Sequence, residues 1–168
     1  MKNNILPGFC QVDHVGLTVP DLEAAVRFYC DTFGAVVIQR MGPYDAREIP
    51  HVADGRDWSD AHFNVPGARF QFVMLGLGPH MKLELFQYDL PADRNTSLPR
   101  NCDLGGHHLA LKVKDLAEAV RFLQQQPGVR VMAGPVEVTE GNWAGMKIIY
   151  FLDPWGNQLE LVEFDPPA

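Results

Sequence analysis

The sequence has few cysteines, no long apolar run and no excess of positive charge. Its three cysteines form no Cys-x-x-Cys spacing, which argues against a cysteine metal site and favours a reducing compartment. No apolar stretch approaches the roughly 18 residues of a membrane span, and Met1 to Phe9 lack the apolar core of a signal peptide. The formal charge of −7 argues against nucleic acid and anionic membranes as partners. We therefore expect a cytoplasmic protein.

The chain contains two copies of one unit. Residues 14–28 and 108–122, offset by 94, agree at nine of fifteen positions, which indicates an internal duplication. Residues 83–86 match residues 159–162 at an offset of 76. Because the two offsets differ by 18, the first copy has 18 more residues between its two matching segments. Each copy begins with a histidine and ends with a glutamate, and these residues are His14 and Glu84, then His108 and Glu160.

Residues 11–90 predict a first module of order βαβββ. Alternating aliphatic side chains over 12–19 predict a strand, after which Pro20-Asp21 begins a helix and Gly34 ends it. A polar loop over about 41–67 holds the insertion, with a short helix near 57–62. The other strands of this module are predicted at 36–40, 69–75 and 81–88.

Residues 107–164 predict a second module of the same order, after a linker over 91–106. We expect a single α+β domain, in which two tandem βαβββ modules form curved mixed sheets around a shared cleft, with the helices outside. The second module is predicted to have a strand at 107–113, a helix at 116–126, a strand at 129–132, a loop at 133–145 and a hairpin of strands 147–152 and 158–164.

Strand alternation places the repeated histidines and glutamates on the cleft face. The leucines on either side of Glu84 and Glu160 must pack on the helices, so the two carboxylates face away from them. A carboxylate in an otherwise apolar strand is costly unless it is paired or binds a metal. Together with His14 and His108, the two carboxylates would form a set of two nitrogen and two oxygen ligands. Such a set suits one divalent ion, which could be Zn²⁺, Ni²⁺, Co²⁺, Fe²⁺ or Mn²⁺. We therefore predict a metal-containing cleft.

The remaining histidines are interpreted differently. His107 neighbours His108, but alternation sends it toward the helix side. His51, His62 and His80 lie in predicted loops, have no repeated counterpart and are expected to be exposed.

Several motifs resemble those of a known superfamily. They are the strand of His14 with its Pro-Asp-Leu helix start, the Gly-Gly-His-His-Leu-Ala segment at 105–110, and the ending Asp-Pro-Trp-Gly-Asn-Gln-Leu-Glu-Leu-Val-Glu at 153–163. Over residues 11–164 the chain resembles the vicinal oxygen chelate superfamily of glyoxalase I, bleomycin-resistance proteins and extradiol dioxygenases. The resemblance implies metal ligands at His14, Glu84, His108 and Glu160, a substrate with vicinal oxygens, and a homodimer.

The four-ligand pattern is similar to that of glyoxalase I and of some sugar-ketone epimerases. It is less similar to the pattern of two histidines and one carboxylate that is typical of ring-cleaving dioxygenases. The resemblance thus implies a glyoxalase I-like lyase or isomerase that moves a proton next to a carbonyl through a metal-bound enediolate. Glu160 would be the base and Glu84 the second catalytic carboxylate. The alternatives are an epimerase of an acyl-CoA or keto-sugar with the same chemistry, an extradiol dioxygenase, and a metal-free drug-binding resistance protein.

Two departures from compact glyoxalases concern the substrate. The loop over 41–67 is longer, and the arginine and asparagine pattern that those enzymes use for glutathione is not found in the sequence. Any one of four arginines is available to an anionic substrate, although surface solvation is the ordinary role of each; they are Arg47, Arg56, Arg69 and Arg94.

Overall fold

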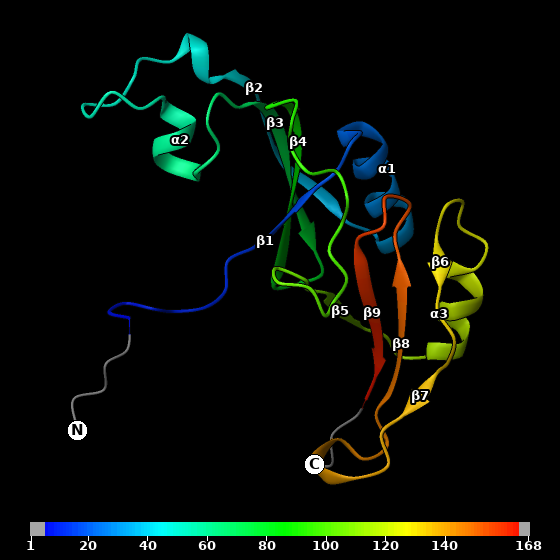
Figure 1. The fold of residues 1–168 in the computed structure, drawn as a ribbon. Helices are drawn as coiled ribbons and strands as arrows, with labels where there is room; N and C mark the ends of the chain where they lie inside the picture. The colour runs from blue at the N-terminus through cyan, green and yellow to red at the C-terminus, as the bar shows by residue number, and fades with distance from the viewer. Residues whose placement is uncertain (1–5, 165–168) are drawn as a thin grey trace. The chain divides into compact units, whose positions relative to one another are not determined.

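The computed structural model describes residues 6–164 of the chain. It divides into two compact units, Met1–Ala92 and Asp93–Ala168, which we call unit 1 and unit 2 (Figure 1). Among the described residues, no helix has both the length and the apolar character that a membrane crossing requires.

Unit 1 is a four-stranded mixed sheet with a helix on one face. Its strands follow the order β1-β4-β3-β2, with β1 parallel to β4 and the other neighbours antiparallel. The elements are β1 (Val15–Thr18), α1 (Leu22–Phe33), β2 (Val36–Asp45), η1 (Ala46–Glu48), α2 (Trp58–Phe63), β3 (Arg69–Leu77) and β4 (Met81–Leu90).

Unit 2 repeats this topology, with the order β5-β9-β8-β6 and a short strand, β7, that also pairs with β8. The predicted fold class, α+β with two βαβββ modules and mixed sheets, is therefore confirmed. The elements are β5 (Leu109–Lys112), α3 (Leu116–Leu123), β6 (Arg130–Val131), β7 (Val136–Glu137), η2 (Gly141–Trp143), β8 (Lys147–Leu152) and β9 (Gln158–Glu163).

The duplication extends to the start of each helix. The N-cap residues Asp21 and Asp115 have the same backbone angles, φ −136° and ψ 103°, and each accepts a hydrogen bond from an N–H in the first turn of its helix. A side chain of the last strand in each unit accepts a second N–H bond. Gln87 accepts from Leu22 at 2.8 Å, and Glu163 accepts from Leu116 at 2.7 Å.

In each unit the core lies between the helix and one face of the sheet. Four side chains of α1 are buried next to β3 and β4, namely Leu22, Ala25, Val26 and Tyr29. In unit 2, α3 buries Leu116 and Leu123 and contacts β9. The leucines that flank the glutamates face these helices and are nearly inaccessible, and each contributes about 1.5–3 kcal/mol by burial; they are Leu83, Leu85, Leu159 and Leu161.

Several predicted bounds were wrong. β2 continues five residues beyond the predicted Arg40, so the insertion begins at Ala46. In unit 2 the matching edge is split into β6 and β7 around Gly134-Pro135. The equivalent Gly42-Pro43 interrupts the pairing of β2 with β3 without ending the strand, because proline has no N–H to donate to the sheet. The predicted loop over 133–145 thus contains a strand, and α3 ends at Leu123 rather than Gln126.

The hairpin between β8 and β9 depends on the Asp153 carboxylate. Asp153 is 2% exposed and accepts bonds from the Trp155 N–H at 3.0 Å, the Asn157 N–H at 2.8 Å and the Asn157 side-chain amide at 2.8 Å. Gly156 completes the turn at φ 94°, a conformation that favours glycine. This network explains why the ending motif contains Asp, Gly and Asn at these positions, and it fixes where β9 begins.

We expect Asp153→Ala to lower the free energy of unfolding by about 2–4 kcal/mol, because buried donors lose a charged acceptor. Urea denaturation followed by circular dichroism measures the loss. Asp54→Ala is the control, because Asp54 is exposed and its carboxylate bonds to the exposed Arg56 two residues along, so no measurable change is expected. Equal losses in the two variants would contradict the role assigned to the Asp153 network.

Candidate metal and catalytic site

His14 and Glu84 form a pair in unit 1. Gly16 of β1 pairs with Glu84 of β4, and His14 precedes β1 by one residue, so its imidazole reaches the carboxylate on the face away from α1. The distance from His14 Nε2 to Glu84 Oε2 is 3.3 Å. The other ring nitrogen, Nδ1, lies 2.8 Å from Asp13 Oδ1. Hydrogen bonds from His14 and then Lys82 lower the pKa of Asp13, which is therefore an anionic partner for the imidazole at neutral pH.

His108 and Glu160 repeat the arrangement in unit 2. Ala110 pairs with Glu160 in the same register as Gly16 with Glu84, and the distance from His108 Nε2 to Glu160 Oε2 is 3.1 Å. Asn101 from the linker lies 3.4 Å from His108 Nδ1. Glu160 is 7% exposed, so its carboxylate is one of the few buried charged groups of the described chain. Each repeated histidine thus lies beside the glutamate of its own unit.

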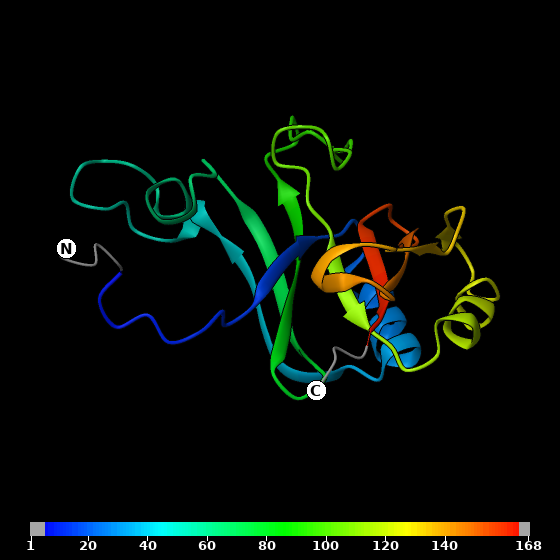
Figure 2. The same ribbon diagram turned by 90° about the horizontal axis from the view of Figure 1, so that it is seen from below.

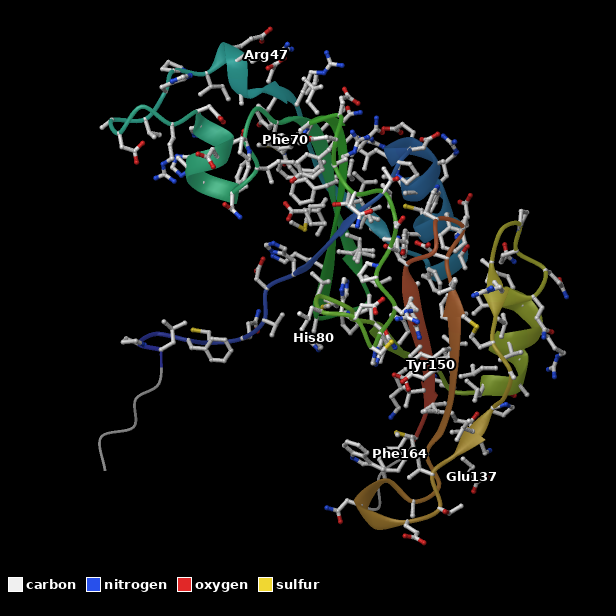
Figure 3. The ribbon with its side chains drawn as sticks, viewed as in Figure 1. Arg47, Phe70, His80, Glu137, Tyr150 and Phe164 are labelled. Atoms are coloured by element: carbon white, nitrogen blue, oxygen red, sulfur yellow. The ribbon has the colours of Figure 1, made fainter. Side chains whose placement is uncertain are left out.

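Tyr150 is a residue of this face that the sequence reasoning missed. It pairs with Glu160 across β8 and β9, and its hydroxyl donates a hydrogen bond to that carboxylate. Its ring meets the His108 ring edge to face, with 5.2 Å between centroids. Figure 3 shows Tyr150 beside strand β8. Burial, followed by the negative charge of Glu160, raises the pKa of Tyr150, so the phenol stays protonated at neutral pH. The offset of 76 aligns Tyr150 with Met74, and a polar residue at that repeated position was the available signal.

Each pair fits two adjacent ligands of one divalent ion. Two ligand atoms at about 2.1 Å from an ion, with an angle of 90–110° between them, lie about 3.0–3.4 Å apart. The two observed nitrogen-to-oxygen distances, 3.3 and 3.1 Å, fall in that range. A metal-bound imidazole also needs a partner at its second nitrogen, and Asp13 is such a partner for His14. Within residues 6–164 no three His, Cys, Asp or Glu side chains gather as a metal-binding group, so the four-ligand set stays a prediction.

The other histidines lie outside these pairs. His107 was expected on the helix side of its strand, but β5 begins only at Leu109, so His107 is exposed and its Nδ1 lies 3.1 Å from the Gly105 carbonyl oxygen. His62 lies in α2, which is the short helix predicted inside the loop, with its ring 5.2 Å from that of Trp58. Three of the four candidate arginines pair with aspartates, and the pairs are Arg47 with Asp45, Arg56 with Asp54 and Arg69 with Asp89.

A cavity of about 440 Å³ opens on the Glu160 face of unit 2. Gln158 contributes to its wall, and it lies two residues before Glu160 on β9, on the same face. Arg130 also contributes, and among the described residues its guanidinium has no carboxylate partner. The cavity therefore has hydrogen-bond donors, and one of them, Gln158, lies about 7 Å along β9 from Glu160.

The chain belongs to the glyoxalase/bleomycin resistance protein/dioxygenase superfamily, whose family model matches residues 13–150. A curated relative from Actinomyces sp. is 44% identical over 169 residues, covering 100% of this chain and 87% of its own length. That relative is named 2-epi-5-epi-valiolone epimerase.

Solved structures agree with this assignment of the fold. A glyoxalase family protein from Bacillus cereus superposes with a TM-score of 0.70 at 19% identity, covering 97% of both chains. A glyoxalase family protein from Enterococcus faecalis has a TM-score of 0.58 at 26% identity, covering 92% of this chain and 98% of its own. The trypanothione-dependent glyoxalase I of Leishmania major has a TM-score of 0.55 at 19% identity, covering 92% of this chain and 87% of its own.

These comparisons favour one of the alternatives drawn from the sequence. The main expectation was a glyoxalase I-like lyase or isomerase, with an epimerase of an acyl-CoA or keto-sugar as the first alternative. The curated relative is an epimerase by its name, whereas the glyoxalase family proteins from Bacillus cereus and Leishmania major are 19% identical and show the fold alone. The epimerase alternative is therefore better supported than the main expectation.

Proposed function

We propose that the protein is a metal-dependent epimerase that inverts the carbon next to the carbonyl of a polyhydroxylated cyclic ketone. The proposal rests on the 44% identity, along the whole chain, to the relative named 2-epi-5-epi-valiolone epimerase. The two His–Glu pairs agree with it, because a hydroxyl next to a carbonyl presents two vicinal oxygens to a metal ion. A divalent ion held by His14, Glu84, His108 and Glu160 would polarise the carbonyl and make the adjacent C–H more acidic.

The side chains of unit 2 supply the groups for proton removal. We assign Glu160 as the base that takes the proton onto its carboxylate. The Tyr150 hydroxyl donates to that carboxylate and holds its orientation. Inversion requires a proton to reach the opposite face of the carbon, and we assign its delivery to Glu84, whose carboxylate would first take up a proton from solvent. Arg130 and Gln158 would bind hydroxyl groups of the substrate in the unit 2 cavity. The homodimer and the cytoplasmic location stay predictions.

The proposal is tested by proton exchange in D₂O. We expect NMR to show deuterium entering the carbon next to the carbonyl of 2-epi-5-epi-valiolone, together with formation of its epimer. Exchange should stop in EDTA and return with Zn²⁺, Ni²⁺, Co²⁺, Fe²⁺ or Mn²⁺, because the polarised carbonyl is what makes the C–H acidic. Two other assays use the same protein: conversion of the methylglyoxal–glutathione hemithioacetal, and oxygen uptake with catechols. Activity in either assay without ketone exchange would replace the epimerase with a glyoxalase or a dioxygenase.

A further inference from the structure

Four aromatic rings form a continuous array on β3 and β4 of unit 1. Phe70 pairs with Tyr88 and Phe72 with Phe86 across the two strands, with ring centroids 5.5 and 5.0 Å apart. Along the strands the rings lie nearly parallel, at 16° between Phe70 and Phe72 and 18° between Phe86 and Tyr88. We call Phe72, Phe86 and Tyr88 the aromatic wall. All three are half-buried, so they retain accessible surface, whereas Phe70 is buried.

The aromatic wall shares its sheet face with the His14–Glu84 pair. Glu84, Phe86 and Tyr88 alternate along β4, so their side chains point the same way. Burial, followed by the negative charge of Glu84, raises the pKa of Tyr88, which agrees with this placement. Opposite them, β1 has Gly16, where a Cβ would lie 3.8 Å from the Phe86 ring and 3.9 Å from Glu84 Oε2. The absence of a side chain at Gly16 leaves the surface between the carboxylate and the wall open.

The insertion closes the far end of this array. Figure 2 shows α2 and its loop at the end of the sheet where β2 ends and β3 begins. Phe63 of α2 meets Phe70 edge to face at 5.4 Å, and Phe70 is consequently 2% exposed. Asp57 holds α2 in place, because it accepts bonds from the Asp60 N–H, the Ser59 hydroxyl and the Gly67 N–H. The 18 additional residues of the first copy therefore build a fixed border beside the wall.

The second copy has a different surface at the same positions. At the offset of 76, Phe72 corresponds to Ile148 and Phe86 to Val162, and only Tyr88 has an aromatic counterpart, Phe164. Conversely, Met74 of unit 1 corresponds to the Tyr150 that bonds to Glu160. After duplication, aromatic surface is thus concentrated beside the glutamate of unit 1, and the phenol that orients a carboxylate is found in unit 2.

We propose that the aromatic wall binds the C–H face of a saturated six-membered ring of the substrate, and thereby makes unit 1 the half that selects cyclic over open-chain ketones. The inference rests on the proposed epimerase function. Ring C–H groups next to hydroxyls carry partial positive charge, and they pack well on the electron-rich faces of aromatic rings. The hydroxyl groups at the ring edge stay available to polar partners. An open-chain hydroxyketone has no such flat C–H face and gains little from the wall.

Replacing one ring of the wall tests the inference. We expect Phe86→Leu to raise KM for the cyclic ketone about tenfold with kcat little changed, because the substrate loses a stacking surface while the carboxylates remain. Exchange of the open-chain ketone hydroxyacetone should be the same in the wild type and the variant. Phe72→Leu is the second variant, in case Phe86→Leu folds poorly. Ile148→Leu, at the matching position of unit 2, is the control and should leave both KM values unchanged.

A binding measurement separates this inference from the proposed function. Titration calorimetry with myo-inositol as a ring probe does not depend on turnover, and we expect weaker binding in Phe86→Leu than in the wild type. Inositol binding that needs Phe86, in a protein that exchanges no ketone proton, would support the wall and reject the epimerase. Unchanged KM and unchanged inositol binding in both leucine variants would overturn the inference, as would a wild type that does not bind inositol. A fall in melting temperature alone would indicate a packing role.

Discussion

Glu160→Gln is expected to slow proton exchange at the substrate carbon by at least about 10³-fold, the range by which a positioned general base accelerates proton transfer. The amide has nearly the same size as the carboxylate but no basicity. It can still accept the hydrogen bond from Tyr150 and face His108, so the fold should persist. Exchange in D₂O followed by NMR measures the loss, and circular dichroism and metal analysis show whether the fold and the ion are retained.

Glu163→Gln is the matched control for this variant. Glu163 lies on the same strand, β9, but bonds to the Leu116 N–H and to Lys147 rather than to a histidine. Its amide can still accept the bond from Leu116, so exchange should stay at the wild-type rate. If Glu160→Gln retains more than about a tenth of the exchange rate, Glu160 is not the base. Glu84→Gln would then be expected to show the large loss instead.

The histidine–glutamate pairs were predictable because the sequence contains them twice. In each copy the leucines on either side of the glutamate must face a helix, and a slip of one residue would reverse every side chain of the strand. That constraint predicts the face on which Glu84 and Glu160 lie, whereas their partners Gly16 and Ala110 come from the structure. An isolated histidine or glutamate in a strand is usually a surface residue, so a single copy would not have marked these residues as a site. Their recurrence at matching positions of the second copy did.

Other features of the two sheets could not be predicted from the sequence, because they depend on which strands pair and in which register. The same alternation that placed Glu160 also applies to Tyr150, but only the register of β8 against β9 brings the two together. The aromatic array likewise depends on Phe72 lying opposite Phe86, 14 residues later. A run of alternating apolar residues predicts a strand with one apolar face, and does not indicate whether that face packs on a helix or remains open.

The sequence alone could not decide between a glyoxalase I-like enzyme and an epimerase. Both reactions begin with removal of a proton next to a carbonyl, so the four predicted ligands are compatible with either. The residues to which we assign substrate selection lie in the aromatic wall of unit 1 and in the cavity of unit 2. These segments follow no repeated pattern, which is why sequence reasoning named the chemistry more readily than the substrate.

His108→Ala is expected to weaken binding of a divalent ion by at least about 100-fold, whereas His107→Ala should leave it unchanged. His108 Nε2 lies 3.1 Å from Glu160 Oε2, so its loss removes one of the two adjacent atoms that we propose as ligands. His107 is exposed and its Nδ1 lies by the Gly105 carbonyl, away from that pair. Titration with Co²⁺, followed by its visible absorption, measures the affinity of each variant.

His14→Ala extends the same measurement to the predicted four-ligand set. If one ion is shared by both pairs, removing His14 of unit 1 should weaken Co²⁺ binding about as strongly as removing His108 of unit 2. A loss in His108→Ala with none in His14→Ala would restrict the metal site to unit 2 and leave Glu84 without a role in it. Loss of the ion in His107→Ala alone would mean that the histidine approaching Glu160 is the neighbouring one, and that the register at the start of β5 is shifted by one residue.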